Sequence, residues 1–281
     1  MEVLIRKIVD AHGLDLQSTH RLFGGDINTV ILLTCSSGKF VAKLNSESYY
    51  PGMFAAEKQG LELLGQSNTF RIPEVIGHGV FDDDSYLLLE YIPSVKRKSD
   101  FWTNFGQKLA KLHAHSSASF GLEIDNYIGS LPQFNASAAT PAEFYILQRL
   151  EPQFKIAHDS GRLIFDTGAF YSSVSDIVPN EPPALIHGDL WNGNYMVDNL
   201  GDPVLIDPAT AYSIREMDLG MIQLFGGFPE IVFSVYNELF PLATGWRERT
   251  SLWQLYYLLV HLNLFGSGYL GQVKSAIAKY S

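Results

Sequence analysis

Short runs of β-branched and aliphatic residues, separated by turn-forming residues, dominate the first ninety positions of the chain. Four of these runs have the length and composition of β-strands: Ile27–Thr34, Lys39–Leu44, Val75–Val80 and Ser85–Ile92. Met1–Leu16 alternates charged and apolar residues as an amphipathic helix does. Pro51–Leu64 also shows helical spacing, and the following Gly65 is expected to cap that helix. The pattern predicts a β-rich region with one helix inserted between its strands.

After Pro93 the hydrophobic positions recur at helical spacing instead. Three stretches show it: Asp100–Ser116, Ala142–Asp159 and the chain from Arg215 onward. Gln133–Pro141 and Ser172–Pro183 are rich in small residues and proline, so we predict that they connect helices. We therefore predict an α+β fold of two lobes. Residues 1–92 would form a small β-rich lobe, and residues 93–281 a larger, mainly helical lobe.

Thr250–Val273 contains no Asp, Glu, Lys or Arg and is long enough to span a bilayer. It nevertheless holds Gln254, His261 and Asn263 together with glycine and serine residues, which a membrane-spanning helix seldom combines. Its apolar residues recur at spacings of three and four. We predict a helix buried in the core of the larger lobe.

The composition and net charge of the chain indicate which kinds of partner it can bind. Of the 281 residues, 46% are hydrophobic, as expected for a packed globular protein. Twenty Lys and Arg residues against thirty Asp and Glu give a net charge of −10, which repels nucleic acid and anionic lipid surfaces. Cys35 is the single cysteine, and the N-terminus lacks the uninterrupted apolar segment of a signal peptide. We expect a cytoplasmic protein that binds neither nucleic acid nor a membrane.

Residues 184–208 carry the strongest chemical signal. Tyr195–Val197 and Val204–Ile206 are predicted to form a short antiparallel hairpin. In such a hairpin the residue before the first strand lies beside the residue after the second. These residues are Asn194 and Asp207, and an amide oxygen beside a carboxylate is suited to Mg²⁺.

Asp189 lies five residues before Asn194, in a loop that contains glycine. The resulting spacing, H-x-D-x-x-x-x-N followed by an aspartate after a strand, is that of the protein-kinase phosphotransfer site. Asp189 is therefore predicted to be able to reach a substrate hydroxyl. A polar hairpin that is merely solvated is the alternative, but it leaves the coincidence of three acceptor groups unexplained.

A kinase-type site also requires a cation for the ATP phosphates and a carboxylate to hold that cation. Lys43 lies in an apolar predicted strand, and Glu57 lies on an otherwise apolar face of the predicted helix Pro51–Leu64. A carboxylate on such a face needs a partner, so we predict a Lys43–Glu57 ion pair. Gly24 and Gly25 precede the first strand of the hairpin, where a loop covering the phosphates would lie.

Glu90, Tyr91 and Ile92 end the last predicted strand of the smaller lobe. Backbone groups of a lobe-connecting segment can hydrogen-bond an adenine edge, so we predict that this segment contributes to ATP binding. Gly60–Ser67 is similar to a Walker A phosphate-binding loop, but it has Gln66 where that motif requires lysine. We therefore predict no Walker A site.

Longer motifs extend this pattern over most of the chain. They are Gly24–Asn28 (GGDIN), His187–Asn194 (HGDLWNGN), Ile206–Ala209 (IDPA), Arg215–Gly220 (REMDLG), Leu224–Phe228 (LFGGF), Phe240–Gly245 (FPLATG) and Leu255–Gly268. Together they resemble the fructosamine kinase (ketosamine-3-kinase) family, within the aminoglycoside-phosphotransferase-like and protein-kinase-like group. The tryptophan shortly after Asp189 and the LFGGF segment are more specific than the general kinase pattern.

The resemblance implies a protein-kinase-like fold and ATP-dependent phosphorylation of the sugar 3-hydroxyl of a ketosamine, a glycated amine on a small molecule or a protein. Because the product is unstable, it also implies a role in deglycation. The implied roles by position are Asp189 as catalytic base, Trp191 against the sugar, Asn194 and Asp207 on Mg²⁺, Lys43 and Glu57 at the ATP phosphates, and Gly24 and Gly25 over them.

Two departures from the family pattern concern specificity and assembly. Phe134–Ser137 lacks the aromatic that many relatives place after Asn135, and Ala142–Leu150 has no tryptophan, so the preference for the amine side stays open. Some relatives carry a cysteine in the glycine loop that is linked to redox-sensitive dimers. This loop holds Asp26 and no cysteine, so we expect no such switch, and a monomer or weak dimer.

Two other functions stay open at this point. The chain could phosphorylate another small hydroxyl compound, such as an aminoglycoside or a choline-like amine, although the LFGGF segment argues against it. It could also be a catalytically inactive nucleotide-binding module, although every catalytic position is filled.

Overall fold

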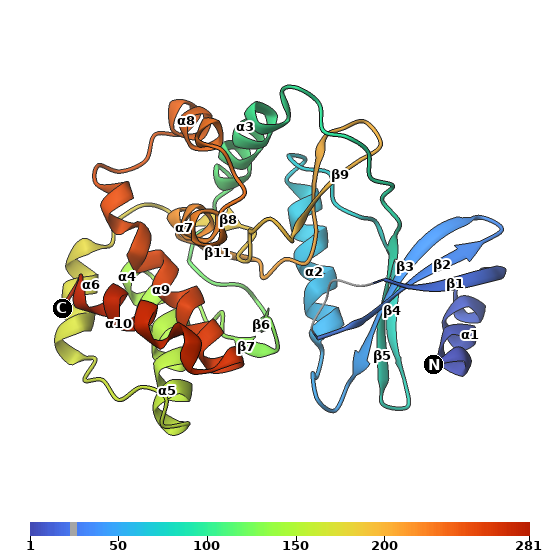
Figure 1. The fold of residues 1–281 in the computed structure, drawn as a ribbon, viewed down its shortest axis with the longest axis horizontal. Coiled ribbons are helices and arrows are strands. Elements are labelled where there is room, and N and C mark those ends of the chain that lie inside the picture. Colours follow the sequence, from blue (N-terminus) through green and yellow to red (C-terminus); the bar gives the residue numbers. More distant parts are fainter. Residues whose placement is uncertain (23–26) are drawn as a thin grey trace. The chain divides into compact units, whose positions relative to one another are not determined.

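The computed structural model describes residues 1–22 and 27–281 of the chain. Gly24 and Gly25, the predicted phosphate-covering residues, lie outside the described residues. The chain divides into two compact units, which Figure 1 shows as ribbons. The first unit comprises Met1–Lys98 and Met196–Asp207, and the second comprises Ser99–Tyr195 and Pro208–Ser281. A short segment from the middle of the chain therefore packs with the first unit.

A five-stranded sheet forms the centre of the first unit (Figure 1). Its strands are β1 (Leu16–Leu22), β2 (Thr29–Cys35), β3 (Gly38–Ser46), β4 (Val75–Phe81) and β5 (Asp84–Glu90). They lie in the order β1-β2-β3-β5-β4, with antiparallel neighbours throughout. The four predicted strands are confirmed. The prediction missed β1, because its sequence LQSTHRL is mostly polar and exposed.

Two helices cover opposite faces of this sheet (Figure 1). In β5, Tyr86 and Leu88 belong to the apolar cluster of α1 (Glu2–Ala11), whereas Leu87 belongs to that of α2 (Met53–Gln66). Successive side chains of a strand point to opposite faces, so a strand covered on both sides is apolar throughout. This explains the unbroken apolar run in β5. The helix predicted over residues 1–16 is shorter than expected, since β1 begins at Leu16.

A small hairpin belongs mostly to the first unit. It pairs β9 (Tyr195–Val197) with β10 (Pro203–Leu205), as the sequence predicts to within one residue. Asp198 closes the turn, because its Oδ1 accepts the backbone N–H groups of Leu200 at 2.8 Å and Asp202 at 2.9 Å. The hairpin is anchored to the rest of the unit through a parallel bridge between Arg71 and Val204.

The second unit is mainly helical (Figure 1). Its helices are α3 (Phe101–His113), α4 (Pro141–Tyr145), a π-helical turn (Ile146–Leu150), α5 (Glu151–Asp159), α6 (Gly168–Ile177), α7 (Glu216–Phe225), α8 (Glu230–Leu239), α9 (Trp246–Phe265), a 3-10 turn (Ser267–Tyr269) and α10 (Leu270–Ala278). Two strand pairs accompany them, β6 (Asn126–Ile128) with β7 (Leu131–Gln133), and β8 (Ala184–Ile186) with β11 (Ala211–Ser213). The α+β architecture is confirmed.

The helix α9 lies at the centre of the second unit, where it packs against α5, α7 and α10. Leu252, Leu259 and Leu262 are fully buried, which confirms the core position predicted from the uncharged stretch. Gly266, with φ of 89°, ends the helix, so the stretch is not one continuous helix. Among the described residues, no helix is both long and apolar enough to cross a bilayer.

The prediction of a connecting segment at Ser172–Pro183 is wrong in its first half. Residues up to Ile177 belong to α6, and that helix buries Phe170 and Val174. Its remaining positions are largely small and polar, so the two buried anchors give too weak a periodic signal.

Two helical glycines have different surroundings, so replacing each with alanine is expected to change the stability of the protein in opposite directions. A β-carbon at Gly106 in α3 would lie 2.7 Å from the carbonyl oxygen of Val232 in α8, whereas one at Gly65 in α2 would meet no atom within 4 Å. Gly65 lies inside its helix, and Ser67 is the cap, contrary to expectation. We expect Gly106→Ala to destabilise the protein by about 1–3 kcal/mol through overpacking. Gly65→Ala should stabilise it by about 0.5–1 kcal/mol.

Urea unfolding of both variants tests this pair of predictions, with Gly65→Ala as the matched control for helix propensity. A Gly106→Ala protein as stable as the Gly65→Ala protein would contradict the close approach of α3 and α8.

Candidate active site

The ammonium group of Lys43 is enclosed by two carboxylates of the first unit. Its Nζ lies 2.7 and 2.8 Å from the two carboxylate oxygens of Glu57 in α2, and 3.1 Å from Oδ1 of Asp207. Lys43 is buried in β3, with only 6% of its surface exposed. The predicted contact between Lys43 and Glu57 is therefore present. The contact with Asp207 was not predicted, because it joins residues 164 positions apart.

The three groups differ in their accessibility and charge. Burial lowers the pKa of Lys43, but the negative charges of Asp207 and Glu57 outweigh this effect and raise the pKa above its ordinary value. Lys43 therefore keeps its positive charge at neutral pH. The Asp207 side chain is 47% exposed, and its backbone has φ of 54°, a region that aspartate tolerates better than most residues. The cluster thus combines a fixed cation with an accessible carboxylate.

The predicted adenine-binding segment lies at the end of β5. The N–H of Glu90 donates to the carbonyl of Glu74 at 2.9 Å, and the N–H of Tyr91 donates to that of Lys39 at 3.4 Å. The Glu90 carboxylate accepts a hydrogen bond from Arg71. The side chain of Glu90 and the backbone N–H groups of Glu90 and Tyr91 are thus engaged within the unit, and the role of this segment in ATP binding stays a prediction. Ile92 is buried.

Asp189 lies in the second unit, in the loop that follows β8. The preceding Gly188 has φ of 84°, and a β-carbon there would lie 2.0 Å from the carbonyl oxygen of Ala209, so only glycine fits. Asn194 donates its amide N–H groups to the backbone oxygen and to Oδ2 of Asp189, both at 2.9 Å. With its nitrogen engaged in this way, Oδ1 is the atom of Asn194 suited to a cation.

Asp218 in α7 holds the backbone of this loop. Its carboxylate accepts the N–H groups of His187 at 2.8 Å and Gly188 at 2.9 Å, and it lies 3.2 Å from Nε2 of His113. The Tyr257 hydroxyl donates to the carbonyl of Gly188 at 3.0 Å. Burial raises the pKa of Asp218, but its contacts with His113 and His187 outweigh that effect and lower the pKa overall. A buried, ionised carboxylate therefore fixes the loop that carries Asp189.

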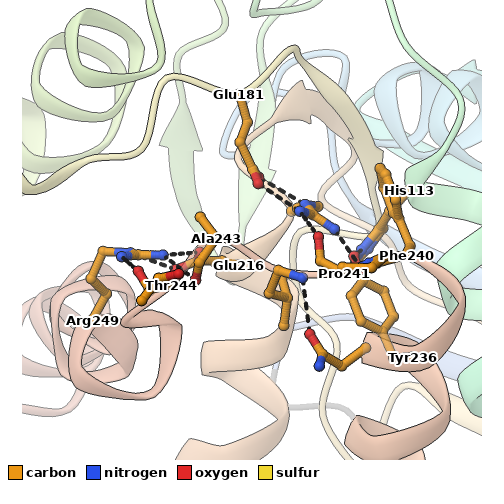
Figure 2. Close-up of polar contacts among 12 residues, drawn as sticks. His113, Glu181, Glu216, Tyr236, Phe240, Pro241, Ala243, Thr244 and Arg249 are labelled. Atoms are coloured by element: carbon orange, nitrogen blue, oxygen red, sulfur yellow. Dashed lines mark hydrogen bonds and ion pairs between the residues drawn. The ribbon is translucent and has the colours of Figure 1, made fainter.

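Two arginines hold a neighbouring loop, the segment 240–244 (Figure 2). Arg215 pairs with Glu181 and donates to the carbonyl groups of Phe240 at 2.9 Å and Pro241 at 2.7 Å. Arg249 pairs with Glu216 in the same way and donates to the carbonyl of Thr244 at 2.8 Å. His113, also drawn in Figure 2, has Nδ1 2.9 Å from the Tyr236 hydroxyl of α8. These contacts tie α3, α7 and α8 together.

Trp191 is 36% exposed and lies two residues after Asp189. Its ring meets that of Phe225 edge to face, with centroids 6.1 Å apart. The second unit thus carries Asp189, Trp191 and Asn194 on one loop. Sequence reasoning missed the residues that hold this loop, Asp218 and Tyr257. The available signal was the aspartate of the REMDLG segment, whose role depends on contacts distant in sequence.

A strand-borne lysine paired with a helix glutamate, and an aspartate loop held by a buried carboxylate, define a phosphotransferase of the protein-kinase-like class. The fold agrees. The crystal structure of a macrolide 2'-phosphotransferase from Brachybacterium faecium superposes with a TM-score of 0.64, covering 100% of this chain and 98% of that one at 16% identity.

The family follows from closer relatives. The family model for fructosamine kinase matches residues 2–281, so the chain belongs to the fructosamine kinase family. A protein of Synechocystis named "Probable ketoamine kinase" is 38% identical over 265 residues, 93% of this chain and 90% of the relative. The chloroplastic protein-ribulosamine 3-kinase of Arabidopsis thaliana is 35% identical, over 92% and 80%. A fructosamine-3-kinase homologue from Haemophilus somnus has a crystal structure with a TM-score of 0.90 at 28% identity, covering 99% and 96%.

The ionised state of Asp218 predicts a pH-dependent stability. In Asp218→Asn one carboxylate oxygen is replaced by an NH2 group, which would oppose the N–H group of either His187 or Gly188, and we expect the free energy of unfolding at neutral pH to fall by about 3 kcal/mol. Because the pKa of Asp218 is lowered in the folded state, its carboxylate stabilises the fold above the unfolded-state pKa of about 3.9. That contribution is lost as the pH falls below this value.

The stability gap between wild type and Asp218→Asn should therefore be constant at neutral pH and narrow below a pH of about 4. Urea unfolding across this range measures it. Asp176→Asn, which changes an exposed carboxylate of α6, is the control and should change stability little across this pH range. A gap that widens on acidification would contradict the assignment.

Proposed function

We propose that this protein transfers the γ-phosphoryl group of ATP to the sugar 3-hydroxyl of a ketosamine. The observation that carries the proposal is the Asp189 loop, anchored by Asp218, in a chain that belongs to the fructosamine kinase family. The names of the relatives, ketoamine kinase and protein-ribulosamine 3-kinase, support a ketosamine as the acceptor. Because the phosphorylated product is unstable, the reaction would remove the sugar from the amine.

Asp189 is the proposed base, which accepts the proton of the attacking hydroxyl as the new bond to phosphorus forms. Its position is set from several sides, since Asn194 binds Oδ2 while Asp218 and Tyr257 bind the adjacent Gly188. A base held in this way stays in the orientation from which it can accept the proton of the hydroxyl. Trp191, exposed two residues further on, is the proposed flat surface for the sugar ring.

Lys43 is the proposed ligand of the ATP phosphates. Its positive charge is maintained by Asp207 and Glu57, and a fixed cation stabilises the charge that develops on the transferred and leaving groups. Glu57 would keep the ammonium group oriented, because both of its carboxylate oxygens contact Nζ. We further propose that Gly24 and Gly25 cover the phosphates and that the backbone of Glu90–Ile92 binds adenine.

Asn194 and Asp207 are the proposed ligands of Mg²⁺. The chemistry of these donors fits, since an amide oxygen and a carboxylate are hard ligands, and the two residues flank the β9–β10 hairpin in the chain. The amide nitrogen of Asn194 is engaged by Asp189, and the carboxylate of Asp207 is partly exposed. When bound together with phosphate oxygens, Mg²⁺ would neutralise part of their negative charge.

A panel of acceptors tests the proposed substrate class. Purified protein with Mg-ATP should phosphorylate a ribulosamine and a fructosamine of the same amine, and phosphorus NMR should place the phosphate on the 3-oxygen. An aminoglycoside and choline serve as control acceptors and should stay unmodified. Transfer to either control in place of the ketosamines would overturn the proposal. Binding of ATP without transfer to any acceptor would favour an inactive nucleotide-binding module.

The role of Asp189 has a direct test. In Asp189→Asn the side chain cannot accept the proton, so we expect kcat to fall by about 10²- to 10⁴-fold. ATP affinity, measured by calorimetry, should stay unchanged. Asp176→Asn, which alters an exposed carboxylate of α6, is the matched control and should keep full turnover. Retained turnover in Asp189→Asn would refute the assignment of the base.

A further inference from the structure

A continuous row of aromatic rings leads away from Trp191 across the second unit. We call it the aromatic strip, and it consists of Trp191, Phe225, His261, Phe265 and Tyr269. The ring of Phe225 lies 6.1 Å from that of Trp191 and 4.9 Å from that of His261. His261 in turn lies 5.4 Å from Phe265 and 5.0 Å from Tyr269. The strip therefore begins on the Asp189 loop and ends beyond the C-terminus of α9.

The strip is exposed because of how two helices end. Phe225 is the last residue of α7 and Phe265 the last of α9, and each is followed by a glycine with positive φ, Gly226 at 70° and Gly266 at 89°. The chain turns away there, and the terminal rings remain accessible. Phe225 is 38% and Phe265 58% exposed. Contiguous exposed aromatic surface of this kind is uncommon unless it binds something.

The strip also lacks charge. Its carboxyl-terminal half lies within Thr250–Val273, which contains no Asp, Glu, Lys or Arg. His261 has Nδ1 2.7 Å from the carbonyl oxygen of Tyr257, and since a carbonyl only accepts, Nδ1 carries the hydrogen. Burial lowers the pKa of His261, an effect that its bond to Tyr257 only partly offsets, so the ring is neutral at physiological pH. A neutral aromatic surface suits apolar groups, and ring faces also attract an organic cation.

A ketosamine has the chemistry to match this surface. One end is the sugar, proposed above to lie against Trp191, and the other is a secondary ammonium that carries the substituent of the original amine. That substituent is the part that differs from one ketosamine to the next. Because the ring contacts of the strip begin at Trp191, the strip is continuous with the surface proposed for the sugar, so it is placed to receive the substituent once the sugar is bound.

We propose that the aromatic strip is the amine-side subsite and that it selects ketosamines whose amine carries an apolar, above all an aromatic, substituent. The inference rests on the proposed function for the identity of the acceptor. The proposal predicts different kcat/KM values for ketosamines that have the same sugar and the same charge but differ in the substituent on the amine. Phe265, the most exposed of the rings, should contribute to that preference without supporting the fold.

The experiment compares the ribulosamines of methylamine and benzylamine. For the wild type, we expect kcat/KM to be about 5- to 10-fold higher with the benzylamine compound, as favourable aromatic contacts allow. Phe265→Ala should reduce this ratio to about one by raising KM for the benzylamine compound alone. Phe265→Tyr should keep the ratio. Leu239→Ala, which removes an equally exposed apolar side chain at the end of α8, is the matched control and should also keep it.

Calorimetric binding of both compounds without nucleotide separates this inference from the proposed function. Tighter binding of the benzylamine compound that is lost in Phe265→Ala supports the subsite, even if no phosphate is transferred. Equal binding and equal turnover of the two compounds would uphold the proposed function and overturn the subsite. A preference that survives Phe265→Ala would also overturn it.

Discussion

A single buried carboxylate fixes the loop of the second unit that carries Asp189. Asp218 is inaccessible to solvent, yet it stays ionised because three hydrogen-bond donors converge on it from α3 and from the loop after β8. Burying a charge is costly unless it is paired and fully hydrogen-bonded, so these donors cannot move independently of one another. The loop that carries Asp189 is thereby tied to the helical core of the unit.

The same principle recurs in the way the unit secures its irregular segments. Arg149, Arg215 and Arg249 are all buried, and each donates to backbone carbonyl groups of a loop. Arg215 and Arg249 are balanced by Glu181 and Glu216, whereas Arg149 donates to the Asn135 side chain and stacks on Phe144. Buried carbonyls of loops need donors, and a guanidinium group supplies several from one side chain. Arginine thus allows long loops to pass close to the core.

Local chemistry was predictable from the sequence, and long-range polar contacts were not. The Lys43–Glu57 pair could be foreseen because a carboxylate on an apolar helix face requires a cation, and a neighbouring strand offers one. The β9–β10 hairpin could be foreseen from its strand–turn–strand pattern. By contrast, β1 carries no periodic signal, and α6 buries only two anchors. The roles of Asp218 and Tyr257 depend on tertiary contacts that no local pattern encodes.

The positions of the aromatic rings have a consequence for how specificity can diverge. Apart from Trp191, the members of the strip lie in the last turn of α7 or α9 or beyond it, whereas Asp218 and Tyr257, which hold the backbone of the Asp189 loop, lie elsewhere in those helices. A substitution at Phe225, Phe265 or Tyr269 can therefore alter the surface offered to a substrate without touching the hydrogen bonds around Asp218. Gly226 and Gly266 have open space around them, so neighbouring insertions meet little resistance. Related enzymes could therefore differ in amine preference through residues at these helix ends while keeping the same contacts around Asp218.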